Sequence, residues 1–152
     1  MDSKNQRILE LSKELLKENG YVLIQGKGEE DILPPEALAE LDKIGFRVYG
    51  FDDMFNSATF KTITYINSAE GLINFLNEDI CKRFVTHVKI EELPVTHSTI
   101  YTSNPRMCLY LNTTHKRIES FKASFIGRKG LRLTELSKYV GYSISLISKE
   151  VN

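Results

Sequence analysis

The stretch LTELSKYVGYSISLISKEVN, residues 133–152, carries the clearest structural pattern in this 152-residue chain. Apolar residues recur at helical spacing in its first half, a glycine follows, and a serine suited to cap a second helix comes next. The pattern predicts two short helices joined by a tight turn, over 133–140 and 143–151. The expected inward positions are Leu133, Leu136, Val140 and Ile147, the small residue at the helix crossing is Ser137, the turn residue is Gly141, and the cap is Ser143.

A third helix is expected immediately upstream, over residues 114–126. Its apolar positions Ile118, Phe121 and Phe125 fall on one side, so it could close a trihelical core with the two helices that follow. The sequence GRKG, residues 127–130, contains two glycines and is predicted to be the turn between this helix and the next.

At these residues the chain resembles the DNA-reading helix-turn-helix of the lactose-repressor family, and it is similar to the broader repressor/Cro-like and partition-protein groups. The likeness covers about twenty residues and rests on Ser137, Gly141, Ser143, Ile147 and the ending ISKEVN. It implies that the second helix enters the major groove of double-stranded DNA and that the protein acts as a homodimer on two half-sites.

The resemblance also implies a role for each polar or basic position. Residues at the start of the second helix would lie near base edges, hydroxyls at helix starts would contact phosphates, and the basic residues would contact the DNA backbone. The expected DNA-binding residues are Arg128, Lys129, Arg132, Thr134, Ser143, Ile144, Ser145, Ser148 and Lys149.

The charge of the chain is unevenly distributed although its formal net charge is zero. Residues 115–152 contain eight basic and three acidic residues, which gives +5, whereas residues 1–114 carry −5. A basic segment attached to an acidic body is typical of a nucleic-acid-binding module joined to another domain. A solvated basic helix face would account for the charge equally well.

The rest of the chain predicts an α/β or α+β domain with a mixed sheet. Helical patterns cover 4–19, 34–45 and 69–85, with Ser68 as a cap, and strand patterns cover 21–26, 46–51, 59–66, 86–93, 98–102 and 107–112. Strand patterns cease after residue 112. Two domains are therefore expected: an acidic α/β domain over 1–112, for dimerisation, sensing or partner binding, and a basic helix-turn-helix segment over 113–152.

The function expected first is a sequence-specific DNA-binding protein, such as a transcriptional regulator or a phage or plasmid replication or partition regulator. The alternative is a protein-interaction module without a DNA role, which would be favoured if Arg128, Lys129, Arg132 and Lys149 did not share one exposed face with Ser145. Aromatic side chains in the first domain favour a core or an interface over base stacking, since that domain is acidic. They are Tyr49, Phe51, Phe55, Phe60, Tyr65, Tyr101 and Tyr110.

No catalytic arrangement is evident, so the chain is not expected to be an enzyme. The weaker alternative is a metal-dependent nuclease-like enzyme using Asp52 and Asp53 with Glu91 and Glu92. The histidines and cysteines lack zinc-ligand spacing, so neither a metal nor another cofactor is expected, and the sequence does not indicate a small-molecule effector. No signal-peptide pattern or membrane span is predicted, so a cytoplasmic protein without a membrane partner is expected, with Cys81 and Cys108 buried as thiols.

Overall fold

The computed structural model describes residues 2–27, 33–48, 60–80, 85–91, 105–112 and 118–149. The chain divides into two compact units, Met1–Asn74 and Phe75–Asn152, and two three-stranded sheets are present in the part that is described. The expected α+β class with a mixed sheet is confirmed. The predicted boundary at 112/113 falls inside the second unit, because the segment beyond it supplies a strand to the same sheet as the segment before it.

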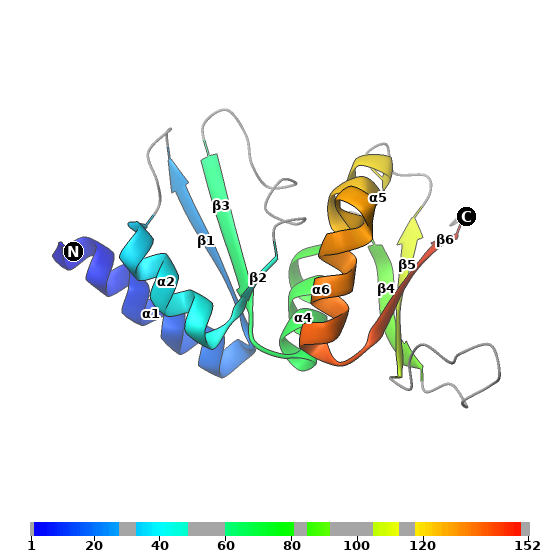
Figure 1. Cartoon of the computed structure of the whole chain (residues 1–152), viewed down its shortest axis with the longest axis horizontal. Coiled ribbons are helices and arrows are strands. Elements are labelled where there is room, and N and C mark those ends of the chain that lie inside the picture. Colours follow the sequence, from blue (N-terminus) through cyan, green and yellow to red (C-terminus); the bar gives the residue numbers. More distant parts are fainter. Residues whose placement is uncertain are drawn as a thin grey trace. The chain divides into compact units, whose positions relative to one another are not determined.

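Unit 1 places helices against a small antiparallel sheet (Figure 1). The middle strand pairs with both of its neighbours in the order β1-β3-β2. Val48 extends the β2–β3 ladder by donating its N–H to Thr64 O at 2.9 Å. The helices over 4–19 and 34–45 and the strands over 21–26 and 59–66 are confirmed with small shifts of their ends. The strand over 46–51 is confirmed only at 46–47, with 49–51 outside the described residues, and the helix over 69–85 is α-helical only as far as Phe75. The elements are α1 Ser3–Asn19, β1 Tyr21–Lys27, α2 Pro35–Ile44, β2 Phe46–Arg47, β3 Phe60–Ile66 and α4 Ala69–Phe75, which runs across the unit boundary.

The core of unit 1 lies between α1, α2 and one face of the sheet. Tyr65 is buried in it, and its hydroxyl donates a 2.6 Å hydrogen bond to the carboxylate of the exposed residue Asp42, so the phenol keeps a polar partner at the edge of the core. Lys13 of α1 and Glu40 of α2 form an exposed ion pair at 3.1 Å. The buried apolar residues of this core are Leu9, Leu16, Val22, Ile24, Leu33, Ala37, Leu41, Ile63 and Tyr65.

The end of α1 is held by the segment that begins α4. The amide of Asn67 donates to Leu16 O at 2.8 Å, and that of Asn74 donates to Asn19 O at 3.0 Å, so two carbonyls at the helix end gain side-chain donors. Gly20 ends the helix with φ +79° and touches the backbone of Gly71. Ser68 caps α4 as predicted, because its hydroxyl accepts from the Gly71 N–H at 3.0 Å.

Unit 2 is a mixed three-stranded sheet with helices on one face (Figure 1). The strand order is β4-β5-β6, with β4 antiparallel and β6 parallel to the central strand. The parallel pair is joined through two helices, as a crossover connection between parallel strands requires. The elements are a π-helical turn Leu76–Ile80, β4 Val85–Glu91, β5 Arg106–Asn112, α5 Ile118–Ile126, a 3₁₀ turn Arg128–Gly130, α6 Leu131–Val140 and β6 Ser143–Lys149.

The second helix of the predicted helix-turn-helix is wrong, because residues 143–149 form the strand β6. The segment alternates serine with apolar residues up to Leu146, and β-branched Ile144 and Ile147 favour a strand. Instead of capping a helix, Ser143 starts the ladder by donating its N–H to Pro105 O at 3.0 Å. Pairing with the buried strand β5 stabilises this segment more than an isolated helix of two turns would be stabilised.

The predicted trihelical core is replaced by a helix-on-sheet core. Lys122 of α5 donates a 3.0 Å hydrogen bond to the hydroxyl of Ser148 in β6, so the side of the sheet that carries Ser148 is the one under the helices. Because side chains alternate along a strand, Ile144 and Leu146 share that side. Leu133, expected to face inward, is half-buried. The buried residues of unit 2 include Met107, Cys108, Leu109, Leu111, Ile118, Phe121, Phe125, Leu136, Val140 and Ile144.

Several expectations fall outside the described residues: the strand over 98–102, the end of the helix over 69–85, Cys81, and the acids Asp52, Asp53 and Glu92. Cys108 is a buried free thiol, as expected. Within the described residues no helix is long and apolar enough to cross a membrane, and no group of three or more histidine, cysteine or acidic side chains is placed to hold a metal ion.

Candidate functional site: the glycine turn between α5 and α6

The turn Gly127–Gly130 connects the two helices that cover the sheet of unit 2, as GRKG was predicted to do. Gly127 closes α5 by donating its N–H to Ala123 O at 3.0 Å, and Gly130 donates to Gly127 O at 3.2 Å. Gly127, Lys129 and Gly130 all have positive φ, at 76°, 57° and 74°. Glycine adopts this conformation readily, but a lysine does so at a cost. The turn is therefore a strained backbone that its surroundings keep in place.

The side chains of the turn are basic and exposed. Arg128 and Lys129 are both exposed, and Arg132 follows within the first turn of α6, half-buried. A Cβ at Gly127 would lie 2.5 Å from Cγ of Arg132 and 2.7 Å from its Cβ, so the stem of this arginine packs against the glycine backbone. Position 127 therefore requires glycine, because its φ is positive and because the Arg132 stem fills the place of a Cβ. The same contact holds the stem of Arg132 beside the turn.

The N-terminus of α6 adds a further positive potential at the same place. Gly130 is its N-cap and makes no side-chain cap hydrogen bond, while the N–H of Leu131 donates to Arg128 O within the turn. The first turn of α6 contains no acidic residue, and the hydroxyl of Thr134 donates back to Gly130 O at 2.9 Å. Free N–H groups at a helix start, together with nearby cations, favour an anion. The first acid along α6 is Glu135.

The structure brings together four of the nine predicted DNA-binding residues: Arg128, Lys129, Arg132 and Thr134, at the turn and the start of α6. The other five lie on β6, which excludes the expected insertion of a recognition helix into the major groove. Ile144 is buried under the helices, and Ser148 is bonded to Lys122 on the same side of the sheet. The remaining three are Ser143 and Ser145, which alternation places on the opposite side, and Lys149, whose side chain lies outside the described part.

The single basic face that was to distinguish the two first hypotheses is therefore not formed. Arg128, Lys129 and Arg132 gather at one turn, but Ser145 lies on the far side of the sheet from the helices. By the test set on the sequence, this outcome favours the alternative of a protein-interaction module and counts against DNA reading by β6. The remaining basic cluster is the one formed by Arg128, Lys129 and Arg132 at the turn between α5 and α6.

Two features of unit 2 were not among the candidate site features expected from the sequence. One is the glycine pair that flanks Arg128 and Lys129, which was assigned only as a connection; the signal was present as G-x-x-G between two helical patterns. The other is a stacked ring pair, His87 of β4 and Tyr110 of β5, with centroids 4.2 Å apart and an interplanar angle of 16°. No local pattern indicates that pair, because its members come together only through the β4–β5 register.

Comparison with family models, with curated proteins and with solved structures finds no match to this chain.

Proposed function

We propose that unit 2 binds single-stranded nucleic acid through the turn Gly127–Gly130. The observation that carries the proposal is a positive-φ Gly-Arg-Lys-Gly turn, with both cations exposed, leading directly into the uncapped start of α6. Gly130 has open space where a Cβ would stand, so a phosphodiester can approach the backbone of the turn closely at this position. The two cations add the charge-assisted contacts that dominate affinity for nucleic acids.

The surrounding fold supports this assignment. KH modules bind single strands with a G-x-x-G loop between two helices, and that loop clamps about four backbone nucleotides. In the described residues of unit 2, two strands are followed by a helix, the G-x-x-G turn, a second helix and a third strand, around a mixed sheet. Unit 2 is accordingly proposed as a KH-like module, on the strength of the turn and its two flanking helices.

The charge distribution agrees with the unit boundary. Residues 75–152 contain twelve basic and seven acidic residues, a net charge of +5, whereas residues 1–74 contain eight basic and thirteen acidic residues, a net charge of −5. Residues 75–114 contain four basic and four acidic residues, so the basic excess of unit 2 comes from residues 115–152, the segment that contains the glycine turn. A basic unit of this kind attracts the phosphate backbone over a distance of about a Debye length.

A single strand is preferred over a duplex for a geometric reason. Reading of duplex DNA at base edges requires an element that fits the major groove, usually a helix or a two-stranded ribbon. The segment expected to be that helix is β6, whose Ile144 is buried and whose Ser148 is bonded to α5. An exposed turn can grip the backbone of a flexible strand, whose bases are free to find contacts beside it.

The test is fluorescence anisotropy of the full chain with labelled single-stranded RNA and DNA, and with the duplex of the same sequence. The informative variant is Arg128→Asp/Lys129→Asp, because aspartate tolerates the left-handed φ of residue 129. We expect it to weaken single-strand binding at least about tenfold and to lower the salt slope by about 1.4, since each lost phosphate contact contributes about 0.7.

The matched control is Lys122→Glu/Lys138→Glu, which makes the same change of net charge on the same two helices away from the turn. It should retain most of the affinity. Equal losses in the two variants would mean that only net charge matters, and tighter binding to the duplex than to the single strand would remove the proposal in favour of duplex recognition.

Self-association of unit 1 is a second candidate function. Leu11 and Leu15 of α1 are four residues apart and 48% and 42% exposed, and Ile44 of α2 is 44% exposed. Exposed leucines on one side of a helix favour a protein interface. The expected homodimer would form here, and sedimentation velocity should show loss of the dimer in Leu11→Glu/Leu15→Glu. A wild-type monomer at all concentrations would exclude it.

A further inference from the structure

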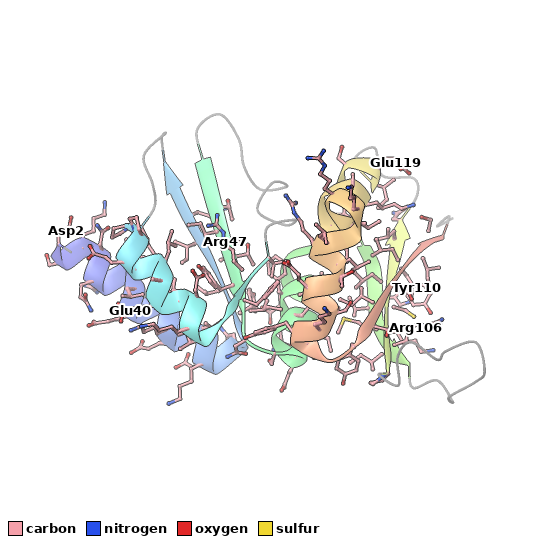
Figure 2. The ribbon with its side chains drawn as sticks, viewed as in Figure 1. Asp2, Glu40, Arg47, Arg106, Tyr110 and Glu119 are labelled. Carbon is pink, nitrogen blue, oxygen red and sulfur yellow. The ribbon has the colours of Figure 1, made fainter. Side chains whose placement is uncertain are left out.

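The sheet of unit 2 has a second face that the glycine turn does not use. Ser148 lies under α5, so by alternation Ile144 and Leu146 lie on the helix side. Their partners on the central strand are Met107 and Leu109, which are buried. The alternate residues of β5, namely Arg106, Cys108 and Tyr110, therefore belong to the face turned away from the helices. Figure 2 labels Arg106 and Tyr110 on that side of the sheet.

The register adds residues of β4 to this face. His87 pairs with Tyr110, and Lys89 pairs with Cys108. His87 and Lys89 are exposed, and Arg106 and Tyr110 are half-buried. The two rings stack on one another at 4.2 Å across the strands, so each ring covers one face of the other, and a base can extend this preset stack from the exposed ring of His87. Cys108 lies beneath its neighbours with 0% exposure, whereas His87 and Lys89 are exposed on this face.

The chemistry of this face fits unstacked bases joined by phosphates. Bases stack on aromatic rings carried by sheets, and cations beside the rings hold the backbone. Lys89 pairs with Cys108 across the strands, and Arg106 lies two residues before Cys108 on β5. On β6 this face carries the hydroxyls of Ser143 and Ser145, with Ile147 beside Tyr110. Glu91, which pairs with Arg106, is the acidic residue of β4. The aromatic residues of this region were expected to be core residues in acidic surroundings, but Tyr110 belongs to the unit with the +5 charge.

We propose that the face of the β4-β5-β6 sheet turned away from α5 and α6 is a second contact surface for single-stranded nucleic acid, with His87 and Tyr110 as its stacking platform. The inference rests on the proposed function of the glycine turn and extends it. A short strand is held at Gly127–Gly130, and a longer strand continues onto the sheet. The site size of unit 2 is then larger than the roughly four nucleotides that a G-x-x-G loop clamps.

The test measures affinity of the full chain against strand length. Labelled single strands of about 5 and about 15 nucleotides bracket the one-site and two-site cases. The longer strand offers more positions at which a single site can bind, and the wild-type protein should bind it more tightly than this statistical factor alone explains. His87→Ala should remove most of that gain, about tenfold, and leave binding of the short strand unchanged. His87→Phe, which keeps a flat ring, should restore the gain.

Tyr139→Ala is the matched control, since Tyr139 is another aromatic residue of unit 2, exposed on α6. It should bind both lengths as the wild-type chain does. If His87→Ala binds both lengths like the wild-type chain while Arg128→Asp/Lys129→Asp binds neither, the sheet surface is excluded and the function of the turn stands. If the wild-type chain binds neither length, the proposed function fails, and the second surface fails with it.

Discussion

Gly20 and Gly71 are packed backbone against backbone, and a side chain on either would overlap the main chain of the other. The contact joins the end of α1 to the first turns of α4, where Asn67 N–H also donates to Gly20 O at 3.0 Å. This close approach lets the amides of Asn67 and Asn74 reach the last carbonyls of α1. The two glycines therefore determine how α1 ends and where α4 begins.

Replacement of Gly71 by alanine should destabilise the protein, although it lies within a helix. Glycine to alanine in an unconstrained helix interior stabilises by about 0.5–1 kcal/mol. Here the added methyl meets backbone, which cannot move aside as a side chain can, and we expect a loss of about 1–3 kcal/mol. Chemical denaturation measures the free energy of unfolding, and Glu70→Ala on the same exposed helix start is the control. A stabilised Gly71→Ala variant would show that the contact is not formed.

Lys129 should trade stability for binding. Its φ of 57° costs a non-glycine residue about 1–2 kcal/mol, so Lys129→Gly should raise the free energy of unfolding while it weakens single-strand binding. Arg128→Gly removes the same charge from a residue without positive φ, and it should weaken binding without the gain in stability. Thermal unfolding of the two variants side by side decides the matter, and equal midpoints would contradict the strained turn.

Ser143 distinguishes a strand from a helix over 143–149. In the strand its N–H donates to Pro105 O, so Ser143→Pro should cost about 1–3 kcal/mol, whereas Ser143→Ala should cost little. If Ser143 capped a helix, alanine would be the costly change, at about 1 kcal/mol, and proline would be tolerated near the helix start. The order of the two denaturation midpoints reports which structure the segment has.

The hydrogen bond between Tyr65 and Asp42 should contribute more to the free energy of unfolding than a hydrogen bond on the exposed surface does. The Tyr65 side chain is buried, and Tyr65→Phe leaves the packing intact but removes the 2.6 Å hydrogen bond, for an expected loss of about 1–2 kcal/mol. A double-mutant cycle with Asp42→Ala isolates the pair. Additive effects of the two substitutions would mean that the bond contributes nothing measurable.

Unit 1 and the helices α5 and α6 follow from local patterns in the sequence. Period-3.6 spacing located α1, α2 and α6, and Ile118, Phe121, Phe125, Leu136 and Val140 were correctly expected to be buried. These signals lie within a few residues of one another, and burial of one helix side enforces them whatever the partner is. A prediction of this kind identifies the buried side of a helix without identifying what covers it.

The site was predicted in part, and the error has a physical origin. Arg128, Lys129, Arg132 and Thr134 were named because a basic turn precedes a helix, and that remains true. Residues 143–149 were assigned to a helix because Ser143 and Ile147 fit helical positions. The serine–apolar alternation from Ser143 to Leu146 is equally visible, but only the presence of β5 as a partner decides between the two patterns.

The parallel pairing of β5 with β6 also has a kinetic consequence. The two strands are separated by residues 113–142, so their pairing closes a long loop that contains both helices. Such non-local pairing is intrinsically slow, because the entropy of closing a long loop is lost before the ladder compensates for it. Until it closes, one edge of the apolar strand Arg106–Asn112 displays free peptide groups, and a β6 segment from another copy could occupy it. Domain-swapped or aggregated species are therefore expected when this chain refolds at high concentration.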